Sequence, residues 1–187
     1  MNPPASVEGR ERVRLFCALR LPAETIDALV AWQRRAFARA EGVRVLSRDH
    51  VHVTLAFLGS RPSEEIGPIG AALREAAARG ERPLLTPRRY RETRSVGMLV
   101  LDDEEGRAGS LALDLFERLE ALGVYEREKR PWLPHVTVIR FRRQPRLEPA
   151  LPELAPFSPS EVALYHSVLR PSGAQYEVLE TAVLGGR

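Results

Sequence analysis

One short motif occurs twice in this chain of 187 residues and constrains its fold more than any other feature. His52-Val53-Thr54 begins an apolar, β-branched run, and His135-Val136-Thr137 begins another such run 83 residues later. Residues i and i+2 of a β-strand lie on the same face. Each copy is therefore predicted to be a strand that presents an imidazole and a hydroxyl together and buries the intervening valine.

A single histidine in an apolar strand is more often a hydrogen-bonded core or edge residue than a catalyst. The chain has only six threonines and four histidines, so a threonine two places after two of those histidines is rare by chance. The pair of motifs therefore indicates a functional site more strongly than either motif does alone.

The length suits one domain that buries a core without disulfide bonds. Cys17 is the lone cysteine, and its neighbours Phe16 and Ala18 favour an ordinary buried thiol. The longest apolar runs are too short to span a membrane, and residues 1–10 lack the apolar segment of a signal peptide. We therefore expect a cytoplasmic protein that does not bind membranes.

The formal net charge of +3 says little by itself, but basic residues gather in three stretches. These stretches contain Arg88, Arg89, Arg91 and Arg94; Arg127, Lys129 and Arg130; and Arg140, Arg142, Arg143 and Arg146. Such stretches are usually solvated surfaces, yet two of them flank the second motif and favour a polyanionic ligand. If that ligand is RNA, longer RNA ends are expected to bind in a salt-dependent way.

Hydrophobic periodicity predicts seven strands and three helices. Strands are expected over residues 12–19, 51–58, 88–93, 95–101, 135–142, 161–169 and 175–184, and helices over about 24–40, 62–78 and 109–122. Five prolines within 145–159 predict an extended crossing segment, and Pro171-Ser172-Gly173 predicts the turn of an antiparallel hairpin.

This order of elements indicates an α+β fold of mainly antiparallel sheet with outer helices. Because a helix and a His-x-Thr strand recur, we expect one domain over residues 1–187 with two lobes related by a pseudo-twofold axis. The motif strands would then face a cleft between the lobes and bring His52 and His135 to either side of one bound group.

The paired motifs resemble the two His-x-Thr signatures of the 2H phosphoesterase superfamily. Other stretches are similar to its branch of RNA 2′,3′-cyclic phosphodiesterases, once described as 2′-5′ RNA ligases: residues 14–22, 57–59, Pro134, Arg140, residues 165–169 and residues 173–176. Val138-Ile139 departs from the usual Leu-Ala, and residues 90–103 resemble the family poorly. The resemblance implies a bilobal α+β fold with a metal-independent active site between the lobes.

Two histidines suit the hydrolysis of a cyclic phosphodiester, because their ordinary pKa near 6.5 allows one to act as base and the other as acid. The resemblance implies that His135 accepts a proton from water and that His52 donates one to the leaving O3′, which yields a 2′-phosphate. Thr54 and Thr137 are placed to donate hydrogen bonds to non-bridging phosphate oxygens.

Arg140 is the phosphate-binding residue that the resemblance implies, and its forked guanidinium suits that role. It lies an odd number of residues after both His135 and Thr137. In a regular strand its side chain would therefore point away from theirs, so a bulge or the end of the strand would have to turn it inward.

The remaining candidates have competing interpretations. His50-x-His52 suggests a metal site, but no further ligand follows at a typical spacing, so we expect neither a metal nor another cofactor. His166 is expected to be structural, with lining of the cleft as the alternative. Tyr125, Trp132 and Tyr165 are candidates either for stacking a base or for the core.

The leading hypothesis is a monomeric hydrolase that acts on RNA with 2′,3′-cyclic phosphate ends or on small cyclic nucleotides. The same acid–base pair could join RNA ends through a 2′-5′ linkage, with a ribose hydroxyl in place of water. A third hypothesis is an RNA- or nucleotide-binding module without turnover, against which the intact His and Thr of both motifs argue.

Overall fold

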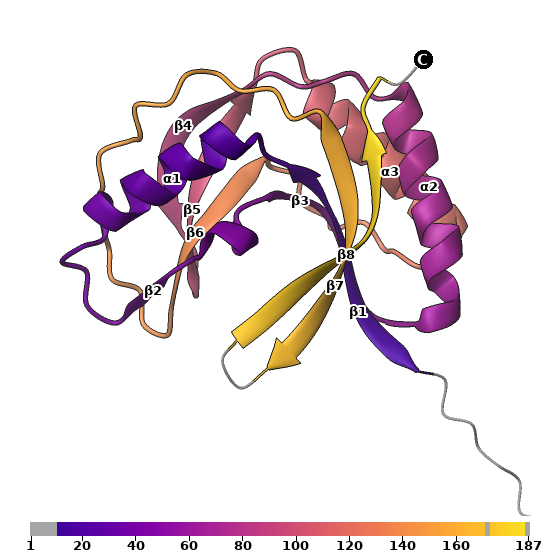
Figure 1. The fold of residues 1–187 in the computed structure, drawn as a ribbon, viewed down its shortest axis with the longest axis horizontal. Coiled ribbons are helices and arrows are strands. Elements are labelled where there is room, and N and C mark those ends of the chain that lie inside the picture. Colours follow the sequence, from indigo (N-terminus) through magenta and orange to yellow (C-terminus); the bar gives the residue numbers. More distant parts are fainter. Residues whose placement is uncertain (1–10, 171–172, 186–187) are drawn as a thin grey trace, which may run out of the picture.

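The computed structural model describes residues 11–170 and 173–185. In this part of the chain, the strands form one antiparallel sheet in the order β4-β5-β6-β3-β1-β7-β8, and β2 also pairs with β6 (Figure 1). The strands are β1 Arg12–Arg20, β2 Val43–Val45, β3 Val53–Pro62, β4 Leu85–Glu92, β5 Val96–Asp103, β6 His135–Phe141, β7 Glu161–Arg170 and β8 Gly173–Val183. The helices are α1 Ala23–Ala36, α2 Ile66–Arg79 and α3 Arg107–Ala121, with short 3-10 turns η1 Arg48–His50 and η2 Ser63–Glu65.

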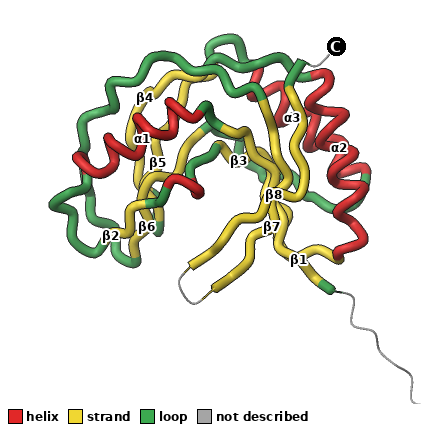
Figure 2. The backbone as a smooth tube through the Cα atoms, viewed as in Figure 1, coloured by secondary structure: helices red, strands yellow, loops and turns green. Residues whose placement is uncertain are grey.

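The sheet is curled and has two halves that meet where β3 lies beside β6. A single residue pair, Val53 and Val136, joins these two strands. Figure 2 shows α1 alone beside the half that contains β4, β5 and β6, whereas α2 and α3 lie together on the other half. The predicted α+β fold is confirmed, and its two lobes are halves of one continuous sheet.

The central position of β1 explains its long buried run. It pairs with β3 on one side and β7 on the other, and residues 15–19 are all buried. Cys17 is fully buried, and this burial raises the pKa of its thiol to about 12. The expectation of an ordinary buried thiol is therefore confirmed.

Several boundaries differ from the prediction. Helix α1 ends at Ala36 instead of Ala40, because Phe37 turns into the core and packs its ring edge-on against Trp32 at 5.4 Å. Strand β3 begins at Val53, so His52 directly precedes it. Strands β7 and β8 form the predicted hairpin. The predicted turn residues 171–172 lie outside the described residues.

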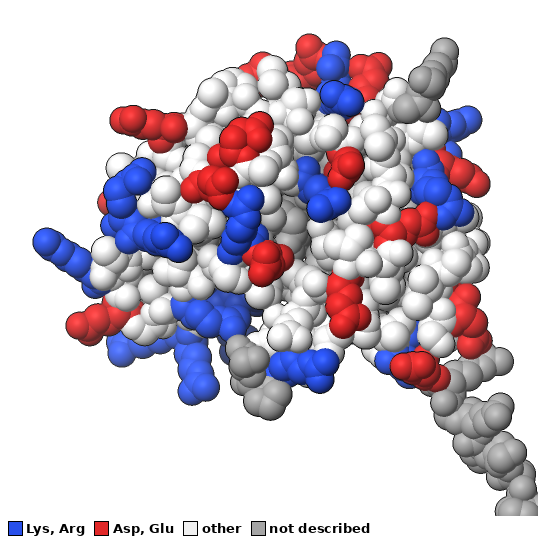
Figure 3. Space-filling model, viewed as in Figure 1, with Lys and Arg blue, Asp and Glu red and all other residues white. Residues whose placement is uncertain are grey.

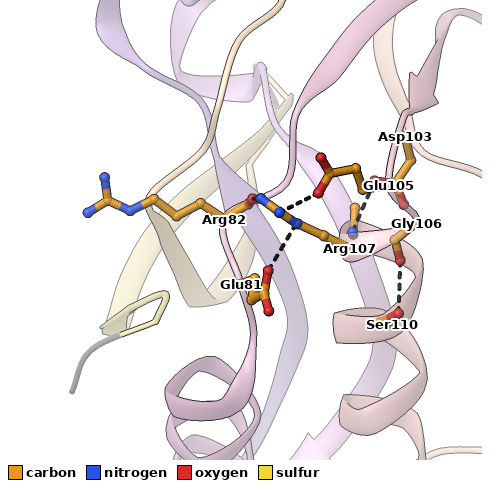
Figure 4. A network of polar contacts seen from close by, with 8 residues as sticks. Glu81, Arg82, Asp103, Glu105, Gly106, Arg107 and Ser110 are labelled. Carbon is orange, nitrogen blue, oxygen red and sulfur yellow. Dashed lines mark hydrogen bonds and ion pairs between the residues drawn. The ribbon is translucent and has the colours of Figure 1, made fainter.

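The acidic turn after β5 fixes the start of α3, two residues earlier than expected (Figure 4). The Asp103 carboxylate accepts hydrogen bonds from the backbone N–H groups of Ala108 at 3.1 Å and Gly109 at 2.8 Å. A carboxylate at a helix N-terminus satisfies free N–H groups and complements the helix dipole. Arg107 also pairs with Glu81 at 3.0 Å, which ties α3 to the segment after α2.

The proline-rich segment crosses between the halves as an extended chain without helix, as predicted. The Trp32 indole donates a hydrogen bond to the Ala150 carbonyl at 2.8 Å, and Phe157 makes a short bridge with Leu85. The segment therefore spans from α1 to β4 before it enters β7. Among the described residues, no helix has the length and apolar character needed to cross a membrane.

Candidate active site

A cavity of about 530 Å³ opens between the two halves of the sheet. Four of the five predicted site residues, His52, Thr54, Thr137 and Arg140, lie in its wall. The wall also contains side chains from β1, β2, β3, the segment around η1 and the β7–β8 hairpin: Arg14, Phe16, Arg44, Phe57, Ser47, His50, Ser167 and Tyr176. The two motifs therefore contribute to one cavity.

The register between the motif strands explains how the two motifs form one site. Val53 pairs with Val136, and both valines are fully buried. When this antiparallel register is continued by one residue in each direction, His52 faces Thr137 and Thr54 faces His135. Directly opposite residues on one face of a sheet have adjacent side chains. This continued register would place each histidine beside the threonine of the other motif.

His135 is half-buried beside this junction and is the one predicted site residue that does not line the described cavity wall. Its charge nevertheless contributes to lowering the pKa of His52. The placement of the two histidines on either side of one bound group stays a prediction.

A β-bulge brings Arg140 onto the cavity face. In the β5–β6 ladder, Met98 pairs with Thr137 and Gly97 pairs with Ile139, so Val138 is an additional residue. A bulge shifts the alternation of side chains by one residue. Arg140 consequently shares a face with Thr137, and the regular alternation that would have pointed it away does not hold.

Distant parts of the chain stabilise this bulge. The Val138 carbonyl accepts hydrogen bonds from the Leu46 backbone N–H at 3.0 Å and from the side-chain amide of the fully buried Gln33 at 2.8 Å. Gly97 faces the bulge, and a Cβ atom there would lie 2.2 Å from the Tyr90 hydroxyl. Helix α1, the segment after β2 and a glycine in β5 thus jointly position Arg140.

Strand β3 has an equivalent bulge. Thr54 pairs with Ala18 and Ala56 pairs with Cys17, which leaves Leu55 as the additional residue. Phe57 therefore shares a face with Thr54 and lines the cavity, with half of its surface exposed. Phe57 and Arg140 each lie five residues after a motif histidine, so they occupy equivalent positions in the two strands.

The two histidines are held in the same way. The Nδ1–H of His135 donates to the Leu133 carbonyl at 2.8 Å. Because a carbonyl only accepts, Nδ1 carries hydrogen and Nε2 of the neutral ring has a free lone pair. A hydrogen bond from His52 to the backbone of His50 raises the pKa of His52. In both motifs the anchor lies two residues before the histidine.

Burial is the largest cause that lowers the pKa of His52, and the charges of His50, His135 and Arg140 add to it, to a value of about 4. The Phe16 ring stacks against the imidazole at 5.0 Å, and the Tyr176 ring packs edge-on at 5.6 Å. In the ligand-free protein His52 is therefore neutral at pH 7. An anion in the cavity would oppose the neighbouring positive charges and raise this pKa.

His50 connects η1 to the β7–β8 hairpin. Its Nε2–H donates to the Ala174 carbonyl at 2.7 Å, and its Nδ1 accepts from the Ser47 hydroxyl at 2.7 Å. Both ring nitrogens are thus engaged. Within the described ranges, no three His, Cys, Asp or Glu side chains gather as a metal site would require. His166 lies outside the cavity wall, 3.5 Å from Glu177, which fits its structural interpretation.

The cavity is strongly basic. Arg14, Arg44 and Arg140 line it, and the described wall contains no Asp or Glu. By contrast, the first two basic stretches found in the sequence are partly neutralised on the surface: Arg88 pairs with Asp102, Arg127 with Glu120 and Arg130 with Glu128. Arg14 and Arg44 were missed by the sequence analysis, although the alternation of β1 places Arg14 on the same face as Phe16.

None of the three aromatic residues considered for base stacking lies in the described cavity wall. Tyr125 and Trp132 pack against the core, whereas Tyr165 lies beside Phe16 and His52, which line the cavity. Tyr125 stacks on Phe116 at 5.0 Å, and Tyr165 stacks on Phe16 at 4.8 Å. The Trp132 indole donates to the Thr54 carbonyl at 3.1 Å, which links the approach to the second motif with the first motif. The aromatic residues in the cavity wall are Phe16, Phe57 and Tyr176, and the Arg14 guanidinium lies 4.8 Å from the Phe57 ring centre.

One motif histidine, both motif threonines and three arginines line a cavity whose described wall has no acidic side chain, a set of groups that suits a phosphate ester. Comparisons with known proteins agree. The family model described as LigT like phosphoesterase matches residues 19–86. A Thermus thermophilus protein named RNA 2′,3′-cyclic phosphodiesterase is 34% identical, over 93% of this chain and 91% of the relative.

Solved structures show the same fold. The crystal structure of TT0787 from Thermus thermophilus has a TM-score of 0.76 at 31% identity, covering 92% of this chain and 98% of that one. Escherichia coli LigT in complex with NADP⁺ has a TM-score of 0.79 at 26% identity, covering 94% and 99%. The chain belongs to the LigT-like phosphoesterase family of the 2H superfamily, as the motifs predicted.

Proposed function

We propose that this protein hydrolyses the 2′,3′-cyclic phosphodiester at RNA ends and leaves a 2′-phosphomonoester. The observation that carries the proposal is the convergence of both His-x-Thr motifs on one basic cavity without acidic side chains in its described wall. Relatives named RNA 2′,3′-cyclic phosphodiesterase support the choice of substrate. We include in the proposal that residues 1–187 act as one monomeric domain in the cytoplasm.

The proposed reaction is a single in-line displacement at phosphorus. Nε2 of His135 accepts a proton from water while the water oxygen bonds to phosphorus, and the P–O3′ bond breaks as His52 donates a proton to O3′. The hydrogen bond from His135 to Leu133 supports the role as base, because it leaves Nε2 free to accept. The assignment of His52 as the acid rests on the family resemblance.

Thr54 and Thr137 would donate hydrogen bonds to the two non-bridging phosphate oxygens, and Arg140 would stabilise their negative charge. The opposite register of the motifs supports this arrangement, since it would set one hydroxyl beside each imidazole. None of these steps needs a metal ion.

The low pKa of His52 is compatible with its role as acid. A cyclic phosphodiester carries one negative charge, and Arg140, whose positive charge helps to lower this pKa, lines the cavity that the phosphodiester would occupy. A bound anion therefore shifts the pKa of His52 upward, toward the protonated form that the reaction requires.

The test is turnover of a short RNA that ends in a 2′,3′-cyclic phosphate, in excess chelator, with the 2′- and 3′-phosphate products resolved. We expect a 2′-phosphate, and a loss of about 10²–10⁴ in rate for His52→Ala and for His135→Ala. His166→Ala is the matched control, because His166 belongs to neither motif and lies on β7 beside Glu177. Full activity in both single variants, or dependence on a metal ion, would contradict the proposal.

A further inference from the structure

A second depression, about 1230 Å³ in volume, adjoins the active-site cavity. Its wall is formed by residues 39–44, from the turn after α1 into β2, and by the end of β6 with the loop that follows. We call it the basic groove, after its five arginines: Arg39, Arg44, Arg140, Arg142 and Arg143. Glu41 is the one acidic residue in the described wall, and Figure 3 shows basic side chains gathered at the lower left, where β2 and β6 end.

The basic groove and the cavity share two of these arginines. Arg44 and Arg140 line both, and they are paired directly opposite each other in the β2–β6 ladder. Like charges directly opposite in a sheet repel each other. An anion bound at this boundary would relieve the repulsion, so the pair marks a place where a chain of negative charges can pass from one depression into the other.

The other residues of the groove wall suit a phosphate backbone better than bases. Phe141 is buried, and Gly42, Val43 and Pro145 offer no polar side chain to read a base edge, so Gln144 is the one neutral polar side chain in the described wall that could do so. Arginines that contact phosphates position a nucleic acid without reading its sequence. The groove therefore has the chemistry of a backbone track and lacks an exposed aromatic platform among its described residues.

We infer that the basic groove binds the phosphodiester backbone of the nucleotides that lie 5′ of the cyclic end. This inference rests on the proposed function and narrows its substrate class to RNA oligonucleotides. A 2′,3′-cyclic phosphate closes the 3′ end of an RNA, so every other nucleotide lies on the 5′ side and must leave the cavity in one direction. The shared Arg44–Arg140 pair gives that direction.

The test compares a nucleoside 2′,3′-cyclic phosphate with an RNA octamer that has the same cyclic end. For Arg142→Ala/Arg143→Ala we expect kcat/KM for the octamer to fall about five- to tenfold, because two exposed phosphate contacts are lost. The value for the mononucleotide should stay near that of the unmodified protein, since neither arginine lines the cavity. A plot of log kcat/KM for the octamer against the logarithm of the salt concentration should also become less steep, by roughly 0.7 for each phosphate contact that is lost.

Arg88→Ala/Arg89→Ala is the matched control, because it removes the same charge from β4, away from both depressions. Equal losses for both substrates, no loss for either, or an equal loss in the control would overturn the inference.

A binding measurement separates this inference from the proposed function. Fluorescence anisotropy of an RNA octamer ending in a 2′-phosphate requires no turnover. Weaker octamer binding by Arg142→Ala/Arg143→Ala would support the groove even if the unmodified protein hydrolysed no cyclic end, an outcome that would contradict only the proposed function. Unchanged octamer binding in a protein that hydrolyses cyclic ends would reject only the groove.

Discussion

Strands β3 and β6 carry the same motif but present different groups to the cavity. Both have a histidine, a threonine two residues later and a bulge at the next residue, and both bury the intervening valine. After the bulge, β3 presents Phe57 whereas β6 presents Arg140. In the proposed reaction, the shared part supplies an acid–base group and a hydroxyl from each strand to one phosphate. The differing part gives the cavity an apolar wall at Phe57, over which the Arg14 guanidinium lies, and a cationic wall at Arg140.

The supports of the two strands differ as well. The β6 bulge is held by Gln33 and Leu46, which fill the hydrogen bonds of the Val138 carbonyl. In β3, the Thr54 carbonyl accepts from Trp132, which comes from the segment just before the second motif. Each motif strand therefore depends on a part of the chain remote from it. The two strands have equivalent motifs and bulges, but different residues support them.

The largest expected effect concerns the charge of His52. Its pKa is about 4 in the folded protein and near 6.5 in an unfolded chain. As the pH falls from about 6.5 toward 4, the unfolded state takes up a proton that the folded state does not, so stability decreases. The loss should approach about 3 kcal/mol near pH 4 and be absent in His52→Gln. Denaturant unfolding of the unmodified protein and of His52→Gln between pH 4 and 7 measures this loss. The same decrease in the free energy of unfolding for both proteins would refute the prediction.

The second-largest effect is expected when Arg140, the residue of the cationic wall, is replaced. Arg140→Gln should lower kcat/KM for a cyclic mononucleotide about 10- to 100-fold, because a charge-assisted hydrogen bond to phosphate is lost. It should also raise the pKa of His52, since the charge of Arg140 helps to lower that pKa. Steady-state kinetics and an NMR titration of the imidazole measure the two effects. Arg89→Gln, on β4, is the control of equal charge.

The paired threonines should behave alike. Thr54→Val and Thr137→Val keep the β-branched shape and remove only the hydroxyl, so each should cost about 3- to 10-fold in kcat/KM. Circular dichroism and thermal unfolding verify that the strands remain folded. A large effect from one variant and none from the other would show that only one motif contacts the phosphate.

The smallest effect is expected at the apolar wall. Phe57→Leu keeps an apolar side chain but removes the ring beneath the Arg14 guanidinium, an exposed cation–π contact. We expect kcat/KM to fall about two- to fivefold, mainly through KM. Measurement of kcat and KM of Phe57→Leu with cyclic mononucleotides that carry different bases tests this expectation. A loss as large as that of Arg140→Gln would mean that the two walls do not differ as described.

The strands that carry the motifs could be predicted from local patterns, but the direction of the Arg140 side chain could not. Alternation predicted that the side chain points away, because periodicity assumes a regular strand. The bulge that reverses it depends on Gly97 opposite Ile139 and on Gln33 from α1, both far away in sequence. The seven residues of β6 by themselves therefore do not predict the bulge.

The basic lining was missed for a related reason. Clusters along the sequence pointed to stretches such as Arg127–Arg130, which pair with nearby acids. The cavity takes single arginines from three strands, Arg14 from β1, Arg44 from β2 and Arg140 from β6. Arginines that are brought together only by the pairing of strands cannot be found by a search for consecutive basic residues.

The most direct test of two motifs acting on one phosphate is a double-mutant cycle with His52→Ala, His135→Ala and the combined variant, using a cyclic mononucleotide. When an acid and a base act in the same step, removal of either one slows that step about as much as removal of both. The two losses in rate are therefore strongly non-additive. We predict that the double variant is about as slow as the slower single variant, with unchanged folding. Losses that multiply, or one histidine whose removal has no effect, would contradict a shared site.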